Sequence, residues 1–193
     1  MKSTFGFSIK DIAEIAILCA LAIILDRFVR IGIGSSGGSI NISMVPLYII
    51  ALRHGWFKSF IAGGFVYGLI TCLLDGYGIQ TYPFEYLLAF GAIAILGIFA
   101  TTINKLCKID NKKNVIISYA IMIACIFAAA VIRYFGATID SMMLWGLNLV
   151  EALVYNASYV FISAIAVCVI MCVLLPTIKM LNNTMPSDFI KNK

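Results

Sequence analysis

Residues 114–132 read NVIISYAIMIACIFAAAVI and contain no charged side chain. At about 1.5 Å per residue, a helix over this run is long enough to cross the hydrocarbon core of a bilayer, which is about 30 Å thick. The whole chain of 193 residues has the same character, with 62% hydrophobic and 12% charged residues and a mean hydropathy of +1.02. A soluble domain carries about 25% charged residues. The composition therefore excludes a soluble enzyme and places the chain in a membrane.

Outward from this run, the chain divides into six apolar segments that are separated by charged residues, glycine and proline. They cover approximately residues 9–29, 42–53, 57–74, 83–104, 114–136 and 147–178. The second segment is short, and the third follows it almost without a break. We therefore predict an all-α integral membrane protein with six transmembrane helices, built as one domain over residues 1–193.

The loops between the segments divide the positive charge unevenly. With the N-terminus in the cytoplasm, only Arg27, Arg30 and Arg133 of the 14 Lys and Arg residues fall on the outer side. Cytoplasmic loops carry an excess of positive residues, so both termini are predicted to be cytoplasmic. The outer half then has a net charge of −2 and the inner half +7, for a total of +5. This mildly acidic outer face favours a cationic solute. Its acids are Asp26, Asp75, Glu85, Asp140 and Glu151.

Motifs for catalysis and nucleotide binding are missing from the sequence. It has no P-loop, no basic cluster interleaved with aromatic residues, and no group of histidines and acids with metal-ligand spacing. The single histidine, His54, adjoins Arg53 and is expected in a solvated cytoplasmic turn. We therefore expect a protein that is not an enzyme, needs no cofactor or metal, binds no nucleic acid and acts within the lipid bilayer.

The most irregular stretch, residues 31–40, reads IGIGSSGGSI and is too rich in glycine and serine to be helical. Non-helical backbone near membrane depth is tolerated where it is buried in protein or lines a cavity. The stretch is therefore a candidate wall or lid of a binding site. A plain surface connector is the alternative.

Glu85 lies about one turn inside the fourth segment, within residues 82–90, which read YPFEYLLAF. A charged side chain at membrane depth costs about 2.5–3.5 kcal/mol and is commonly kept for a partner or a substrate. Glu85 is therefore a candidate ligand-binding residue. The alternative is a water-exposed carboxylate that the helix dipole stabilises near a helix start, which Pro83 favours.

The sixth segment carries a polar stripe at helical spacing, formed by Asn148, Glu151, Tyr155 and Tyr159. In lipid, such a stripe is expected to face the interior of the bundle. Asn156 lies on a different side of the same helix and reaches the same ligand only if the pocket wraps this end. The alternative is that Asn156 and Ser158 form hydrogen bonds between helices.

Three other features near the membrane faces indicate packing or ligand contacts: a tryptophan, an arginine and a face of alanines. Trp145 suits either an interfacial belt or stacking on a cationic ring, and its position favours the belt. Arg133 is most simply a charge partner of Asp140 or Glu151 at the outer edge. In the first segment, Ala13, Ala16 and Ala20 form a face of small side chains that allows close packing of another helix or a different subunit.

Several of these stretches resemble the substrate-binding S components of energy-coupling factor (ECF) vitamin transporters, and within them the thiamine-specific type. The resemblance covers nearly the whole chain. It rests on residues 16–20 (AILCA), 37–46 (GGSINISMVP), 51–55 (ALRHG), 85–89 (EYLLA), 133–135 (RYF) and 155–159 (YNASY).

The resemblance implies a six-helix protein of a prokaryotic cell membrane that captures thiamine from outside. It also implies a complex with a transmembrane coupling subunit and two cytosolic ATPases, in which Ala16 and Ala20 contact the coupling subunit. Family ligand positions correspond to Glu85, Trp145 and Asn156, and a tyrosine of the family pocket corresponds to Glu151, whose second carboxylate favours a cation. The full set of expected substrate-binding residues is Glu85, Tyr86, Ser141, Trp145, Glu151, Tyr155 and Asn156.

The leading hypothesis is thus an S component for thiamine or a closely related cationic compound. An S component for another small vitamin or precursor, such as hydroxymethylpyrimidine, is the alternative within transport. A membrane enzyme that uses Glu85 and Glu151 as an acid/base pair is the alternative from a different class.

Overall fold

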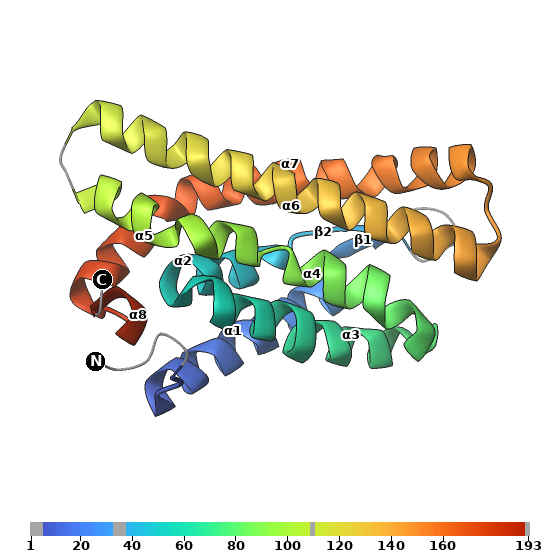
Figure 1. Ribbon diagram of the computed structural model, residues 1–193, viewed down its shortest axis with the longest axis horizontal. Coiled ribbons are helices and arrows are strands. Elements are labelled where there is room, and N and C mark those ends of the chain that lie inside the picture. The colour runs from blue at the N-terminus through green and yellow to red at the C-terminus, as the bar shows by residue number, and fades with distance from the viewer. Residues whose placement is uncertain (1–5, 33–37, 109–110, 192–193) are drawn as a thin grey trace.

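The structure is a computed structural model that describes residues 6–32, 38–108 and 111–191. It is an elongated helical bundle whose long helices follow the long axis of the molecule (Figure 1). The first half of the chain forms α1 (Ile9–Phe28), β1 (Arg30–Gly32), β2 (Ser39–Asn41), α2 (Met44–Phe60), the π-helix η1 (Ile61–Tyr67) and α3 (Gly68–Asp75). The second half forms η2 (Ile79–Thr81), the π-helix η3 (Tyr82–Leu88), α4 (Ala89–Gly91), α5 (Ala94–Lys108), α6 (Lys112–Trp145), α7 (Leu149–Thr184) and α8 (Asp188–Lys191).

The chain reverses direction inside α2, at Gly55. The φ angle there is +79°, a left-handed conformation that glycine adopts without strain. Contacts with α1 show the reversal. Asn41, before the first arm, binds Asp26 near the end of α1, and Lys58, just after the turn, binds Asp11 near its start. On the return arm, the Thr71 backbone oxygen accepts a hydrogen bond from Arg27, again near the end of α1. The return arm then runs back through η1 and α3. The short second segment and the third segment predicted from the sequence are therefore the two arms of one hairpin.

Four stretches are long and apolar enough to cross a membrane: Met44–Asp75, Ile79–Lys108, Lys112–Trp145 and Leu149–Thr184. The first of them contains both arms of the hairpin. α1 has 20 residues but carries charges at both ends, so its composition alone does not qualify it. With α1 and the two arms counted separately, the bundle has the six helical segments that the sequence predicts. The first and last described residues lie at the same end of the molecule, as an even number of spans requires (Figure 1).

A cluster of buried charges fastens the start of α1 to the turn of the hairpin. Lys58 Nζ lies 2.7 Å from Asp11 Oδ2, and both side chains are almost completely buried. Arg53 pairs with Glu14. Between them, His54 Nδ1 lies 3.3 Å from Asp11 and His54 Nε2 lies 3.4 Å from Glu14. The expectation of a solvated histidine is wrong, because α1 and α8 pack over this turn and bury it.

The small side chains of α1 point away from the rest of the bundle. Ala13, Ala16 and Ala20 are all exposed, whereas Ile15, Cys19 and Ala22 on the opposite side are buried. Within the described part of the chain, then, no helix covers the alanine face.

Candidate functional site

A cleft opens at the end of the bundle opposite the termini, which is the outer end according to the charge distribution. Its empty volume is about 620 Å³, including the part that is open to solvent. The walls come from α1, the β-hairpin, α3, η3, α6 and α7. The charged side chains that line it are Asp26, Arg30, Asp75, Glu85, Arg133 and Asp140.

One wall of the cleft depends on a close approach between η3 and α6. A Cβ atom at Gly136 of α6 would lie only 2.5 Å from the backbone oxygen of Phe84, so a larger residue would push the two helices apart. η3 begins with Pro83 in its first turn and has π-helical geometry, which is frequent at functional sites. This contact places Glu85 against the buried face of α6 that carries Arg133 and Asp140.

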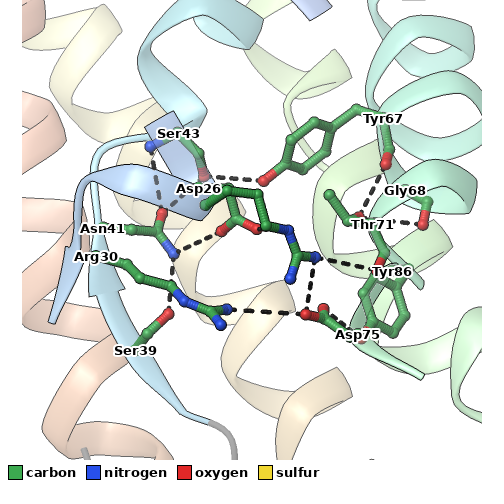
Figure 2. Close-up of polar contacts among 11 residues, drawn as sticks. Asp26, Arg30, Ser39, Asn41, Ser43, Tyr67, Gly68, Thr71, Asp75 and Tyr86 are labelled. Carbon is green, nitrogen blue, oxygen red and sulfur yellow. Dashed lines mark hydrogen bonds and ion pairs between the residues drawn. The ribbon is translucent and has the colours of Figure 1, made fainter. Parts of the chain in front are cut away.

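A second wall is held by hydrogen bonds around Asn41 (Figure 2). The Asn41 amide nitrogen donates to Asp26 and to Ser39, each at 3.3 Å. Its amide oxygen accepts hydrogen bonds from the backbone and the hydroxyl of Ser43 at 3.2 and 2.7 Å. The Tyr67 hydroxyl donates to Ser43 in turn, at 3.0 Å. This network fixes the β-hairpin to α1, α2 and η1.

Asp75, at the end of α3, is the centre of an ion-pair network at the rim (Figure 2). Its carboxylate lies 2.8 Å from Arg27 and 3.8 Å from Arg30. It also accepts a hydrogen bond from the Tyr86 hydroxyl at 2.8 Å. Two of the four carboxylates in the cleft, those of Asp26 and Asp75, are therefore engaged within the protein.

The other charged groups of the cleft are not paired with each other. In the part of the chain that the structure describes, Glu85 and Asp140 have no hydrogen bond or ion pair. Arg133 is 5% exposed, lies over the Phe90 ring with its guanidinium carbon 5.1 Å from the ring centre, and contacts the Met44 sulfur at 3.4 Å. The expected ion pair of Arg133 with Asp140 or Glu151 is wrong, because Arg133 lies two turns below Asp140 on α6 and points inward.

Aromatic side chains form the mouth of the cleft. α6 continues to Trp145, nine residues beyond the predicted end of this segment, and so brings the indole into the lining. The Trp145 and Tyr77 rings meet edge to face with centres 5.7 Å apart. Trp145 is 40% exposed, so it can contact both a ligand in the cleft and the membrane interface.

Comparison with known proteins decides the family of the chain. Residues 12–183 match the family described as thiamine transporter protein (Thia_YuaJ). This chain belongs to that family. It is 30% identical over 176 residues to the thiamine transporter ThiT of Bacillus subtilis (strain 168), covering 85% of this chain and 89% of the relative. Identity to ThiT of Lacticaseibacillus paracasei is 26% over 177 residues, with 85% and 86% covered.

The fold agrees with a solved structure from the same family. ThiT from Listeria monocytogenes superposes with a TM-score of 0.74 at 26% identity, over 88% of this chain and 96% of that chain. Membership of the thiamine transporter family confirms the resemblance to thiamine-specific S components that the sequence indicated. It also identifies the chain as a multi-pass membrane protein of a transporter family and supports the expectation that it is not an enzyme.

In this thiamine transporter family member, four of the seven residues expected to bind substrate line the cleft: Glu85, Tyr86, Ser141 and Trp145. Tyr155 and Asn156 do not line the cleft but contact residues that do, Gly38 and Ser141. Asn156 is completely buried and donates hydrogen bonds to Ser141 at 2.9 Å and to the Ala152 backbone at 2.8 Å, while it accepts one from Tyr159 at 2.5 Å. Asn156 therefore joins α7 to α6, as the interhelical alternative proposed, and orients two residues of the lining.

The structure places Glu151, the remaining expected substrate-binding residue, outside the cleft lining. It is exposed at the start of α7, where its carboxylate accepts a hydrogen bond from the Asn148 backbone at 3.1 Å. Asn148 returns a bond to the Glu151 backbone at 2.9 Å, which completes a capping box. The prediction that Asn148 and Glu151 face the interior is wrong, because both belong to the helix cap and not to a buried turn.

The glycine-rich stretch is a wall of the cleft. β1 and β2 pair antiparallel with Arg30 opposite Asn41, and Gly38, Ser39 and Asn41 line the cleft. The Gly38 backbone donates to the Tyr155 hydroxyl at 2.7 Å, and a Cβ atom at Gly38 would lie 2.6 Å from that oxygen. The alternative of a lid depends on residues 33–37, which lie outside the described part of the chain.

Sequence reasoning did not select Asp26, Asn41, Asp75 or Asp140 as site residues, although all four line the cleft. The charge distribution had already placed the three acids on the outer side. Their positions at the ends of apolar runs were the available signal, since charged groups at membrane depth tend to be functional. Their assembly into one cleft depends on the hairpin reversal and on contacts between distant segments.

Proposed function

We propose that this protein captures thiamine in the outer cleft and delivers it for import as the substrate-binding subunit of an ECF-type transporter. The observation that carries the proposal is the Glu85 carboxylate, which lines a cleft at the outer end of a membrane bundle and has no partner among the described residues. Relatives that align over most of the chain are named thiamine transporters, which supports this choice of ligand.

The chemistry of the lining suits thiamine. Its thiazolium ring carries a permanent positive charge that a carboxylate attracts at any pH, and aromatic faces attract cations. Glu85 and Trp145 supply these two groups. The aminopyrimidine half carries hydrogen-bond donors and acceptors that match the hydroxyls of Tyr86 and Ser141. We assign these four residues to direct contact with the ligand.

Tyr155 and Asn156 are assigned a positioning role. Tyr155 holds the backbone of Gly38 in the cleft wall, and Asn156 orients Ser141 and Tyr159. Each acts on the ligand through a residue that lines the cleft.

The energy for release into the cell is assigned to partner proteins. The sequence contains no P-loop, so hydrolysis of ATP by that route requires separate ATPase subunits. A transmembrane coupling subunit would link the two cytosolic ATPases to this chain. The exposed alanine face of α1, at Ala16 and Ala20, allows a partner helix to approach closely, and we assign the coupling contact to it.

Titration of the purified protein with thiamine tests the proposed function. The chain has two tryptophans, and Trp145 lies in the lining, so ligand binding should change the fluorescence. A Trp145→Phe variant identifies which part of the signal comes from the cleft, and calorimetry measures affinity without relying on fluorescence. Absence of binding at micromolar thiamine would refute the proposal, and a panel including hydroxymethylpyrimidine would then identify the ligand.

A further inference from the structure

Asp140 is a buried carboxylate that has no ion-pair partner among the residues that the structure describes. It is 8% exposed and lines the cleft from α6, one residue before Ser141. Over the described ranges, its side chain has no hydrogen bond and no cation within ion-pair distance. Burying an ionised carboxylate costs free energy unless a partner compensates it, so a group in this state is suited to an external partner.

The charges of the cleft lining indicate which ligand charge would compensate Asp140. Asp26 and Asp75 are engaged with Asn41 and with Arg27 and Arg30. The charged lining groups that remain unpaired in the described structure are Glu85, Asp140 and Arg133.

These three groups form one electrostatic unit. Arg133 and Asp140 lie on the same buried face of α6, the close contact of Gly136 with Phe84 brings Glu85 against that face, and all three side chains line the same cleft. Arg133 carries one positive charge against the two carboxylates, so the unit has a net charge of −1 when all three are ionised. A ligand with one positive charge brings the sum to zero, whereas a neutral ligand leaves one buried charge uncompensated.

We propose that Asp140 is a specificity-determining residue that, together with Glu85, selects a ligand carrying a single positive charge over its neutral analogues. This inference rests on the proposed function in so far as thiamine is that cation. It assigns to Asp140 the second carboxylate role that the sequence had suggested for Glu151.

The test compares thiamine with deazathiamine, a neutral isostere in which a carbon atom replaces the charged ring nitrogen. In the wild-type protein we expect thiamine to bind at least about tenfold more tightly than deazathiamine, because a desolvated charge pair is lost in the neutral complex. In an Asp140→Asn variant, thiamine should bind at least about tenfold more weakly than in the wild type, while deazathiamine loses much less affinity. The preference for the cation should therefore collapse.

Glu151→Gln is the matched control. It removes one negative charge at the same end of the molecule, on the neighbouring helix and outside the cleft, and the glutamine can still complete the helix cap. It should keep the wild-type preference for thiamine. If Asp140→Asn behaves like this control, the inference about Asp140 fails while the proposed function stands.

Thermal unfolding without ligand supplies a test that does not depend on thiamine. Because Asp140 has no internal partner in the described structure, Asp140→Asn should unfold at the same temperature as the wild type or a higher one. A lower unfolding temperature, or an equal loss of affinity for both compounds, would mean that Asp140 is structural and would overturn the inference. If the wild type binds no thiamine, the proposed function fails. The unfolding comparison then still shows whether Asp140 is a structural residue or a carboxylate without an internal partner.

Discussion

The Asn156 amide nitrogen donates a hydrogen bond to the Ser141 hydroxyl over 2.9 Å and thereby joins α7 to α6 directly behind the cleft. Asn156 is completely buried and has its donors and acceptor occupied by groups of the protein. This contact connects the stability of the bundle to the shape of the binding site, since Ser141 and Tyr159 both line the cleft.

Replacing Asn156 should therefore affect folding and binding together. We expect Asn156→Ala to lower the free energy of unfolding by about 1–3 kcal/mol, because it leaves buried polar partners unsatisfied. Thiamine affinity should fall as well, since Ser141 and Tyr159 lose the group that orients them. Thermal unfolding in detergent and calorimetric titration measure the two effects. Ser158→Ala is the control, because among the described residues the Ser158 hydroxyl bonds only to the Tyr155 backbone of its own helix; it should leave both quantities near wild type.

Glu85→Gln should weaken thiamine binding by more than about tenfold, since the variant removes a carboxylate that faces a permanent cation in a desolvated site. Glu85 makes no hydrogen bond or ion pair in the described structure, so the variant should still fold and unfold near the wild-type temperature. Calorimetry at constant salt measures the affinity. An unchanged affinity would contradict a ligand-binding role and favour the alternative, in which Glu85 is a carboxylate that the helix dipole stabilises near a helix start.

Bulky residues on the alanine face of α1 should separate binding from transport. Ala16→Trp and Ala20→Trp are expected to leave thiamine affinity unchanged, because both positions are exposed and neither belongs to the cleft lining. Uptake of labelled thiamine by cells that express the full transporter should be abolished, since close helix approach requires small side chains. Ala128→Trp, at an exposed position on α6, is the matched control and should retain uptake. Normal uptake in both α1 variants would contradict the assignment of this face.

The buried pair of Lys58 and Asp11 is expected to stabilise the hairpin turn. Lys58→Met removes the ammonium group that lies 2.7 Å from the buried Asp11 carboxylate and should lower the free energy of unfolding by about 3–5 kcal/mol. The double variant Asp11→Asn with Lys58→Met removes both charges and should recover a large part of that loss. Chemical or thermal unfolding of the four proteins of this double-mutant cycle measures the coupling. If the two single changes are additive, the pair does not act as a unit.

The sequence predicted the helical segments well, because long runs of apolar residues specify membrane helices locally. It also placed Glu85, Tyr86, Ser141 and Trp145 in the region of the site. The errors concern His54, Arg133 and Glu151, whose surroundings are set by other segments. α1 and α8 bury His54, Arg133 stacks on Phe90 of another helix, and Glu151 is used by the cap of its own helix. The partners of a charged side chain follow from packing, which a single sequence does not contain.

The reversal at Gly55 also sets the depth of the cleft. From His54 back to Met44 the first arm has 11 residues, which is about 16 Å of helix, or roughly half of the hydrocarbon thickness. Arg133, at the base of the cleft, touches the Met44 sulfur at the outer end of this arm. The floor of the cleft therefore lies about 16 Å of helix, or roughly half of the hydrocarbon thickness, from the turn at Gly55. Beyond this floor the first arm fills the bundle with the buried side chains of Leu47, Ile50 and Ala51, so packed apolar side chains separate a solute in the cleft from the opposite end of the molecule.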